Sequence, residues 1–304
     1  MTAPLSAIYG PTASGKTALA IELAQATGAA VLNADSMQIY ADLRIVTARP
    51  SPEEEAAAEH RLYGVLAGDD PCSVARWTAM VRAEIAALAP RPVILVGGTG
   101  LYLNALHDGL SSIPEPSDEV RTAAHARLDA LGVAGFRDEV LRLDPATPDS
   151  IIDPQRLLRI WSVSTATGKP LTHWQGDKKG GLGPFPIIDL APRRTDLHAR
   201  INQRFSLMLE QGAVEEVAEL LTRGYDPSLP IMRAVGVPEL AEVVRGTLDA
   251  EAAREKACAA SRQYAKRQLS WGRNQLMHAI KFREYPINLE EMQIIKADIL
   301  SVIG

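Results

Sequence analysis

The chain of 304 residues has few of the residues that indicate a disulfide-bonded or zinc-dependent protein. Its two cysteines, Cys72 and Cys258, are far apart in the sequence. No C-x-x-C pair is present, and the six histidines lack the spacing of metal ligands. The sequence therefore predicts neither a disulfide framework nor a zinc site.

Long apolar stretches and an N-terminal targeting pattern are also missing. No apolar run reaches the roughly 18 residues of a membrane-spanning helix, and no charged region followed by an apolar one opens the sequence. The composition, 46% hydrophobic and 23% charged, is typical of a globular protein. We therefore expect a soluble, cytoplasmic protein that makes no membrane contact. We also expect a monomer, because the sequence has no heptad pattern or obvious apolar stripe.

Acidic residues slightly outnumber basic ones overall, but basic residues are concentrated in one stretch. The formal net charge of −5 by itself argues against a nucleic-acid partner. From Arg254 to Arg283, however, eight lysines and arginines stand against one acidic residue, Glu255. Local charge governs docking more than net charge does, so this stretch is compatible with binding to a nucleic acid.

The clearest motif lies near the N-terminus, between an apolar run at Leu5–Tyr9 and a helical pattern at Ala18–Thr27. It fits G-x-x-x-x-G-K-[ST], in which backbone N–H groups surround phosphate oxygens and a helix begins with its positive end toward the anion. The strand, loop and helix follow in the required order, which disfavours a glycine-rich turn that binds nothing. The expected phosphate-binding residues are Gly10, Pro11, Thr12, Ala13, Ser14, Gly15, Lys16 and Thr17.

Two side chains of this motif have separate expected roles. Lys16 supplies a positive charge to the outer phosphate, and Thr17 offers its hydroxyl to Mg²⁺. The chain is therefore predicted to bind a phosphorylated ligand.

Apolar runs predict an α/β fold with a parallel sheet. They alternate with helical patterns and lie at Leu5–Tyr9, Ala29–Ala34, Pro92–Val96 and Pro186–Leu190. The last two runs are about ninety residues apart, too far for a simple crossover. We therefore expect a P-loop NTPase-like core of residues 1–113 and 184–304, with a helical subdomain inserted at 114–183.

Helix signals occur in the insert and after Arg193. In the insert, Ser117 resembles a helix start, a second helix covers Asp153–Thr167, and a Gly-rich loop is expected over Lys178–Pro184. The helices expected afterwards cover Asp196–Gln211, Ala213–Arg223, Val237–Gly246 and Leu248–Phe282.

Polar residues follow the second and third predicted strands, where parallel sheets bind ligands. Asp35 has three readings: metal ligand, general base, or cap of a following helix. The third strand ends in glycines rather than in the Asp that helps to hold Mg²⁺ in many NTPases, which disfavours a motor or GTPase. Gly97 and Gly98 would let a substrate approach the backbone, with Thr99 as a hydrogen-bond partner. A plain tight turn is the alternative.

Two groups of basic residues have helical spacing. Arg156 and Arg159 are three residues apart, so they share one helix face. The second group is Arg262, Lys266 and Arg273, with Ser270 on the same face. Both groups could contact phosphates or could form an ordinary solvated surface. We expect Trp271 to lie in the hydrophobic core rather than to stack on a base.

Together these motifs resemble the bacterial tRNA dimethylallyltransferases over about residues 5–275. The motifs, in order, are Gly10–Thr17, Asp35–Tyr40, Thr47–Pro50, Val96–Tyr102, Asp153–Arg159, Arg233–Gly236 and Gln263–Arg273. The chain departs from the family pattern at Val237, where Tyr is common. It also departs at Ser270 and Gly272, where Thr and a bulkier apolar residue are usual.

The resemblance implies a reaction and its machinery. A dimethylallyl group passes from dimethylallyl diphosphate to the exocyclic 6-amino group of the adenosine 3′-adjacent to the anticodon in tRNA, and diphosphate leaves. The phosphate loop then holds that diphosphate with Mg²⁺, so no strand-end Asp is needed. The implied catalytic residues are Asp35 as general base, Thr99 at the adenine or the diphosphate, and Lys16 and Arg233 as cations.

The resemblance also implies a tRNA surface and leaves three rivals. The implied tRNA-contacting residues are Asp35, Ser36, Met37, Gln38, Thr99, Arg121, Gln155, Arg156, Leu157, Leu158, Arg159, Lys266, Arg267, Gln268 and Arg273. The rivals are an adenylate isopentenyltransferase of cytokinin synthesis, a P-loop small-molecule kinase and a non-enzymatic, nucleotide-dependent binding module, which Asp35 and Thr99 beside the loop disfavour. The insert and the basic C-terminal helices favour tRNA over a nucleotide-sized acceptor, and the missing strand-end Asp disfavours a kinase.

Overall fold

The chain forms two compact units. The computed structural model describes residues 3–176, 178–276, 279–283 and 289–303. The core unit comprises Met1–Ala105 and Pro184–Gly304, and the inserted unit comprises Leu106–Gly183. The inserted unit begins at Leu106 rather than at residue 114, because strand β5 (Gly109–Ser111) pairs with β6 (Lys178–Gly180) inside it.

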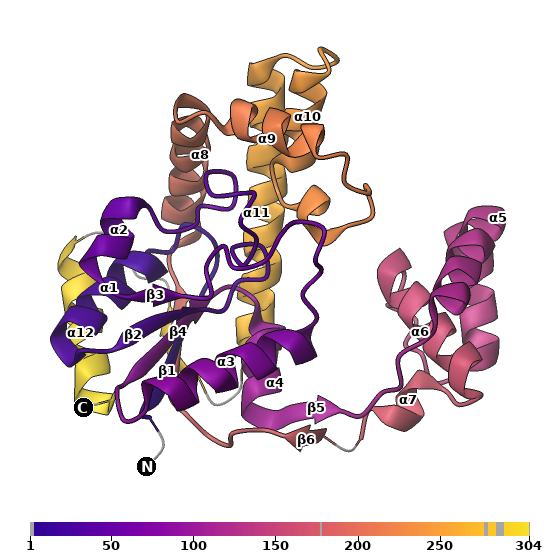
Figure 1. The fold of residues 1–304 in the computed structure, drawn as a ribbon, viewed down its shortest axis with the longest axis horizontal. Helices are drawn as coiled ribbons and strands as arrows, with labels where there is room; N and C mark the ends of the chain where they lie inside the picture. The colour runs from indigo at the N-terminus through magenta and orange to yellow at the C-terminus, as the bar shows by residue number, and fades with distance from the viewer. Residues whose placement is uncertain (1–2, 177, 277–278, 284–288, 304) are drawn as a thin grey trace. The chain divides into compact units, whose positions relative to one another are not determined.

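In the part of the chain that the structure describes, the core unit contains a six-stranded sheet whose paired strands are all parallel (Figure 1). The spatial order is β3 (His60–Arg61), β2 (Ala30–Asn33), β4 (Val93–Gly97), β1 (Leu5–Tyr9), β7 (Ile187–Ala191) and β8 (Ile280–Arg283). The predicted α/β fold is therefore confirmed. Strand β3 was missed because two residues are too few to form an apolar run.

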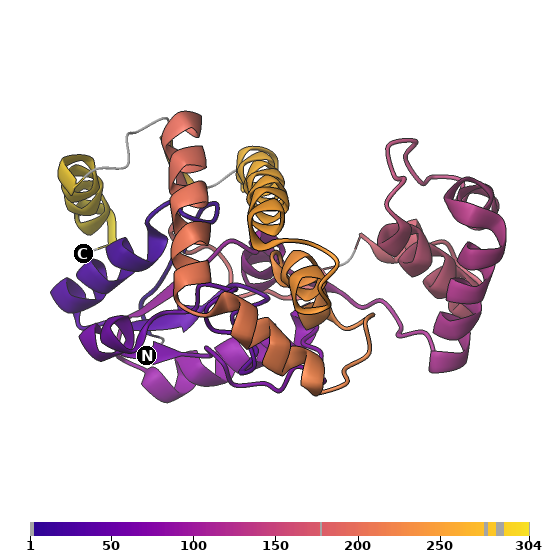
Figure 2. The same ribbon diagram turned by 90° about the horizontal axis from the view of Figure 1, so that it is seen from above.

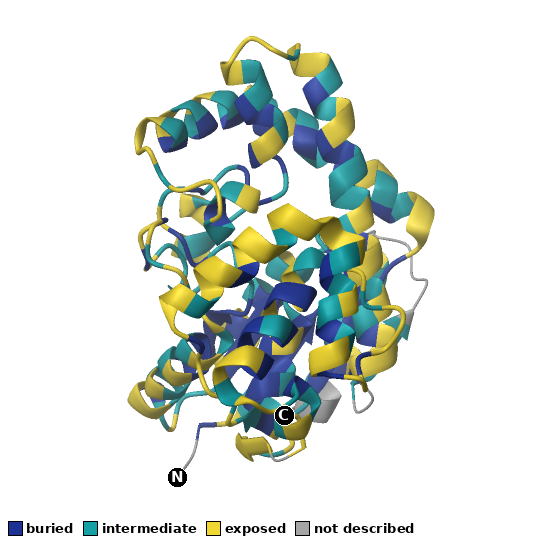
Figure 3. Ribbon diagram, turned by 90° about the vertical axis from the view of Figure 1, so that its right-hand side faces the viewer, coloured by how far each residue is buried: buried dark blue, intermediate teal, exposed yellow. Residues whose placement is uncertain are grey.

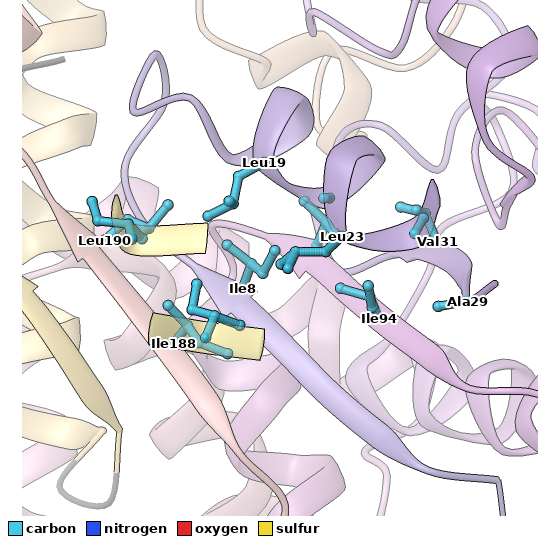
Figure 4. Close-up of a cluster of buried hydrophobic side chains, with 13 residues drawn as sticks. Ile8, Leu19, Leu23, Ala29, Val31, Ile94, Ile188 and Leu190 are labelled. Atoms are coloured by element: carbon cyan, nitrogen blue, oxygen red, sulfur yellow. The ribbon is translucent and has the colours of Figure 1, made fainter. Parts of the chain in front are cut away.

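One face of the sheet is covered by α1 (Lys16–Thr27) and α12 (Leu289–Ile303). Leu19 and Leu23 of α1 point onto the sheet, where they meet Ile8, Ile94 and Ile188 (Figure 4). These side chains are at most 2% exposed, so they form the closed core beneath the phosphate loop.

The opposite face is covered by α3 (Val74–Leu88), α4 (Gly100–Asp108) and α11 (Ala250–Gln275). Trp77 of α3 stacks on Tyr102 of α4, with 4.4 Å between the ring centroids, and donates from Nε1 to the Asn33 carbonyl at 2.9 Å. Tyr9 donates its hydroxyl to the Gln268 carbonyl of α11 at 2.7 Å. Because side chains alternate along a strand, Tyr9 meets α11 while Ile8 meets α1.

The remaining helices of the core unit are α2 (Pro52–Ala57), α8 (Arg194–Glu210), α9 (Ala213–Thr222), the short helix η1 (Pro230–Arg233) and α10 (Val237–Val244). Helices α8 and α11 lie side by side through Leu197, Ile201 and Ala265 (Figure 2). The helix expected over Leu248–Phe282 is wrong at its end, since α11 stops at Gln275 and β8 pairs with β7.

The inserted unit consists of α5 (Asp118–Leu143), α6 (Pro154–Thr167), α7 (Leu171–Trp174) and the β5–β6 pair. Ser117 and Asp153 cap α5 and α6 through their side chains, and Gly168 ends α6 at φ 64°. Strand β6 begins where a loop was predicted over Lys178–Pro184.

Burial follows the layers of each unit, and the buried strands of the sheet are β1, β2, β4 and β7 (Figure 3). None of the helices described is long and apolar enough to cross a membrane.

Candidate functional site

Three loops meet at the carboxyl edge of the sheet. Strands β2, β4 and β1 are neighbours in that order, and they lead into residues 34–38, 98–99 and 10–15. Parallel strands place these loops at one edge. The amide of Thr99 donates to the carbonyl of Ala34 at 3.3 Å, which joins two of the three loops directly.

A cavity of about 830 Å³ opens at this edge, and we call it the loop cavity. Its walls come from residues 12–18, Asp35, residues 37–38, residues 44–49, residues 51–54, α8 and α11. Its volume lies in the range of small-molecule sites, roughly 300–1,000 Å³. Lys16, Thr17 and Asp35 all line it, whereas Thr99 and Arg233 are not among its lining residues.

The phosphate loop curls back on itself before α1 begins. Ala13 and Gly15 have positive φ values of 62° and 91°, and Gly15 precedes the first helical residue, Lys16. The Lys16 ammonium donates to the Pro11 carbonyl at 2.6 Å. Burial lowers the pKa of Lys16 to about 7, although the Asp35 carboxylate opposes that shift. An anion bound beside Lys16 would therefore raise this pKa and favour the charged ammonium form.

Asp35 is held by the side chain of Asn33, which is fully buried. The Asn33 carboxamide accepts from the Asp35 amide at 2.7 Å and donates at 3.0 Å to the carbonyls of Asp35 and Leu62. Asp35 in turn accepts from the Met37 amide at 2.9 Å through Oδ1. Turns follow Asp35 rather than a helix, so it is not a helix cap. This clamp fixes the backbone from which the carboxylate projects.

Thr99 supports the same segment from the end of β4. Its hydroxyl oxygen accepts from the Ser36 amide at 3.0 Å and lies 3.4 Å from the Ser36 hydroxyl oxygen. Burial raises the pKa of the Tyr264 hydroxyl, and the Asp35 charge adds to that effect. Tyr264 lines the loop cavity and stays protonated at neutral pH.

The glycines at the end of β4 let other segments of the protein approach closely, and Gly97 also lines the loop cavity. A Cβ atom at Gly97 would strike the Ala34 backbone, and one at Gly98 would strike the Gln268 side chain. At Gly100 the obstacle would be the indole of Trp271. The missing side chains therefore accommodate β2 and α11.

Gln268 of α11 joins two of the site's loops and is 4% exposed. Its carboxamide donates to the Gly98 carbonyl at 3.1 Å and accepts from the Thr12 amide at 2.9 Å. A tRNA contact was predicted for Gln268, but this amide is used inside the protein. The C-terminal helix thus completes the hydrogen bonding of the phosphate loop.

We expect Gln268→Ala to lower the free energy of unfolding by about 1–3 kcal/mol, because it strips the part-buried N–H of Thr12 and the buried carbonyl of Gly98 of their partners. Chemical denaturation followed by circular dichroism measures this change. Asn274→Ala, at an exposed position of α11, is the matched control and should shift stability by less than about 0.5 kcal/mol. Equal stability of the two variants would contradict the bridging role.

A second cation at the phosphate loop is Arg204 of α8, whereas the predicted Arg233 is not among the residues that line the loop cavity. Arg204 donates to the Thr12 hydroxyl at 3.3 Å and to the Ala48 carbonyl at 3.4 Å. Burial lowers its pKa. Arg233 is exposed on η1, where its charge acts on Asp226. Arg200 and Arg204 both line the loop cavity, and their i, i+4 spacing is the sequence signal that could have found them.

The other predicted tRNA contacts divide by burial. Exposed residues are Arg121, Gln155, Arg156, Arg159, Lys266, Arg267 and Arg273. Leu157 and Leu158 belong instead to the hydrophobic core of the inserted unit, which corrects their prediction as contact residues. Helix α6 turns its arginines outward and these leucines inward. Met37 and Gln38 line the loop cavity, and Ser36 is held by Thr99.

Comparison with known protein families identifies the family to which the chain belongs. The model of the IPP transferase family matches residues 38–275, and the model of isopentenyl transferase matches residues 3–66. The chain belongs to the IPP transferase family. The resemblance drawn from its motifs is thereby confirmed.

The chain resembles known proteins over most of its length. This chain is 46% identical over 273 residues to the tRNA dimethylallyltransferase of Phenylobacterium zucineum, and the match covers 88% of this chain and 89% of that protein. It is 48% identical over 284 residues to the tRNA dimethylallyltransferase of Rhodospirillum rubrum, and this match covers 90% of this chain and 86% of that protein. The crystal structure of the tRNA isopentenylpyrophosphate transferase of Bacillus halodurans matches with a TM-score of 0.68 and 29% identity, covering 99% and 96%.

The structure shows the surroundings of two residues, Gly272 and Val237, at which the sequence departs from the family pattern. A Cβ atom at Gly272 would lie 2.6 Å from Asp189 Oδ2 and 2.8 Å from Tyr9 Cε1. Glycine therefore lets α11 approach β1 and β7 closely. Val237, the first residue of α10, is 1% exposed and thus a packing residue.

Proposed function

We propose that this chain transfers a dimethylallyl group from dimethylallyl diphosphate to the exocyclic 6-amino group of the adenosine 3′-adjacent to the anticodon in tRNA. The observation that carries the proposal is that the phosphate loop and the Asp35 carboxylate line one cavity. An anion site and a proton acceptor are the two groups that such an alkyl transfer needs. The names of the two bacterial relatives support tRNA as the acceptor.

Departure of diphosphate is assisted by charge. As the allylic C–O bond breaks, negative charge grows on the leaving oxygens. The Lys16 ammonium, the Arg204 guanidinium and the loop N–H groups stabilise that charge where it develops. Lys16 must release the Pro11 carbonyl in order to reach the ligand.

Asp35 acts on the acceptor. The adenine amino nitrogen forms the new C–N bond and loses a proton, which the Asp35 carboxylate accepts. The base leaves its stack in the anticodon loop to reach the loop cavity. The Asn33 clamp keeps the carboxylate at a fixed place during this transfer. Thr99 is proposed to act on the substrates as well as on Ser36.

Magnesium is part of the proposal, with Thr17 as its protein ligand. The described residues contain no group of three or more acidic, histidine or cysteine side chains that could hold a metal. Mg²⁺ is commonly bound by one or two protein oxygens together with phosphate oxygens and waters. The Thr17 hydroxyl lines the loop cavity and fits this pattern. The bound ion would neutralise part of the diphosphate charge.

The other proposed features follow from the tRNA substrate. The exposed arginines of the inserted unit and the basic face of α11 are the proposed contact surfaces for the anticodon stem-loop. A monomeric, cytoplasmic enzyme is proposed, since tRNA is in the cytoplasm. The rival nucleotide prenyltransferase and kinase functions find no support in the names of the relatives.

The test is incubation of the purified protein with dimethylallyl diphosphate and bulk tRNA. Mass spectrometry of the digested nucleosides should detect one prenyl mass increment on adenosine. Free AMP in place of tRNA is the control acceptor and should remain unmodified. Prenylation of AMP instead of tRNA would support the cytokinin-type rival, and no prenylation of either would refute the proposal.

The basic face of α11 leads to a prediction about salt. Arg262 donates to Asn202 Oδ1 at 2.7 Å and thus joins α11 to α8, whereas Lys266 and Arg273 are exposed. We expect the double variant Lys266→Ala/Arg273→Ala to reduce the slope of log affinity for tRNA against log salt by about 1.5, because each phosphate contact adds about 0.7–0.9. Filter binding over a salt series measures it. An unchanged slope would mean that this face is ordinary solvated surface.

A further inference from the structure

The segment Arg44–Arg49 is a wall between two cavities, and we call it the wall loop. All six of its residues line the loop cavity. Arg44 and Ile45 also line a second cavity of about 710 Å³ in the core unit. Arg44 and Ile45 have space on both sides and gain little from packing there, whereas Val46 is buried. Hydrogen bonds therefore contribute much of what holds this end of the wall loop.

Glu216 of α9 supplies the most concentrated set of these hydrogen bonds. Its carboxylate accepts from the amides of Arg44 at 2.7 Å, Ile45 at 2.8 Å and Val46 at 2.9 Å. The first two bonds end on Oε1 and the third on Oε2. Three successive amides on one ionised carboxylate are short, charge-assisted contacts. They hold the wall loop from a helix far away in the sequence.

The wall loop carries this constraint to the phosphate loop. Its residue Ala48 has φ 51°, a left-handed conformation that costs energy in a residue other than glycine. The Ala48 carbonyl accepts from Gln38 at 2.9 Å and from Arg204 at 3.4 Å. Arg204 also donates to Thr12 of the phosphate loop. Glu216 is therefore connected to the anion site through the wall loop and Arg204.

We propose that Glu216 is a positioning residue for the transfer site: it fixes the wall loop so that the Ala48 carbonyl orients Arg204 toward the diphosphate. The inference deepens the proposed function and rests on it. Glu216 acts through Arg204 and touches no substrate. Its loss should therefore weaken binding of the donor diphosphate as well as lower the rate.

Glu216→Gln is the sharpest single change. A carboxamide has one acceptor oxygen, so in either orientation its NH₂ group faces at least one of the three backbone N–H groups. Misplacement by about 1 Å costs up to 10²-fold in reactions that depend on positioning. We expect KM for dimethylallyl diphosphate to rise about 10-fold, with a fall in kcat. The dissociation constant of inorganic pyrophosphate, measured by calorimetry, should rise in parallel.

The matched control is Glu215→Gln, which makes the same change of charge at the exposed neighbouring position of α9. It should leave both constants unchanged. Glu216→Asp keeps the charge and both acceptor oxygens on a shorter stem, and its constants should lie between wild type and Glu216→Gln. KM decides the matter, because partial unfolding lowers the active fraction and hence kcat without changing KM.

The inference fails if both Glu216 variants keep the wild-type KM and pyrophosphate affinity while kcat follows the folded fraction. If neither variant folds, hydrogen exchange of the wild-type protein decides it. The amides of Arg44, Ile45 and Val46 should then be strongly protected, and exchange at the rate of free peptide would overturn the inference. Failure of the proposed function is separate, since it is absence of tRNA prenylation by the wild type.

Discussion

Asp35→Asn is expected to lower kcat for adenosine prenylation about 10²–10⁴-fold, the usual contribution of a general base. Asparagine has the same shape, and the Asn33 clamp bonds only to the backbone of residue 35. The carboxamide oxygen can also still accept from the Met37 amide. The substitution therefore removes the capacity to take a proton, together with the negative charge that raises the pKa of Lys16. Steady-state kinetics with saturating tRNA and donor measures the loss.

The control for this prediction is Asp69→Asn, which makes the same chemical change at an exposed position. It should leave kcat unchanged. KM for tRNA should change little in Asp35→Asn, because the proton transfer occurs only in the transition state. The kcat comparison is made at saturating donor, since loss of the Asp35 charge also lowers the pKa of Lys16. If Asp35→Asn turns over at the wild-type rate, Asp35 has no part in the proton transfer.

Lys16→Ala is expected to weaken binding of dimethylallyl diphosphate about 10- to 100-fold, since a hydrogen bond to a charged group contributes about 1.5–3 kcal/mol. The size of the effect depends on pH. Burial lowers the pKa of Lys16 to about 7, so the free protein carries the ammonium form below that pH and loses it above. Only the ammonium attracts the diphosphate. The ratio of wild-type to variant affinity should therefore be largest at acidic pH and fall as the pH rises through 7.

Calorimetry at about pH 6 and about pH 8 checks this prediction, because the variant corrects for ionisation of the ligand itself. Binding above pH 7 should also take up a proton in the wild type, since the bound anion restores the charge of Lys16. Lys16→Arg, which stays charged, should take up none. A ratio of affinities that is constant with pH would contradict the buried ammonium.

Local patterns were enough to predict the first part of the site. The strand at Leu5–Tyr9 was predicted with the bounds that the structure has, because an apolar run ends directly at the phosphate loop. Asp35 was found because carboxyl ends of parallel strands gather at one edge. Each of these signals lies within about ten residues of the chain.

The partners supplied by distant helices could not be predicted in this way. Arg204, Glu216 and Gln268 each reach the site from helices that follow the sheet's first strands by more than a hundred residues. The spacing of Arg200 and Arg204 marks a basic helix face, but it does not show which loop that face contacts. The segments that approach Gly98 and Gly100 could not be predicted either. A missing side chain indicates a close approach, but the sequence does not identify what approaches.

The bridge made by Gln268 has a consequence for synthesis on the ribosome. The segments containing Thr12 and Gly98 are made early, and the residue that pairs with both is made late. Until α11 docks, water must satisfy these two backbone groups, and the phosphate loop lacks one of the contacts that hold it. In an incomplete nascent chain the anion site is therefore less ordered, and its hydrogen bonding is completed only when α11 is in place.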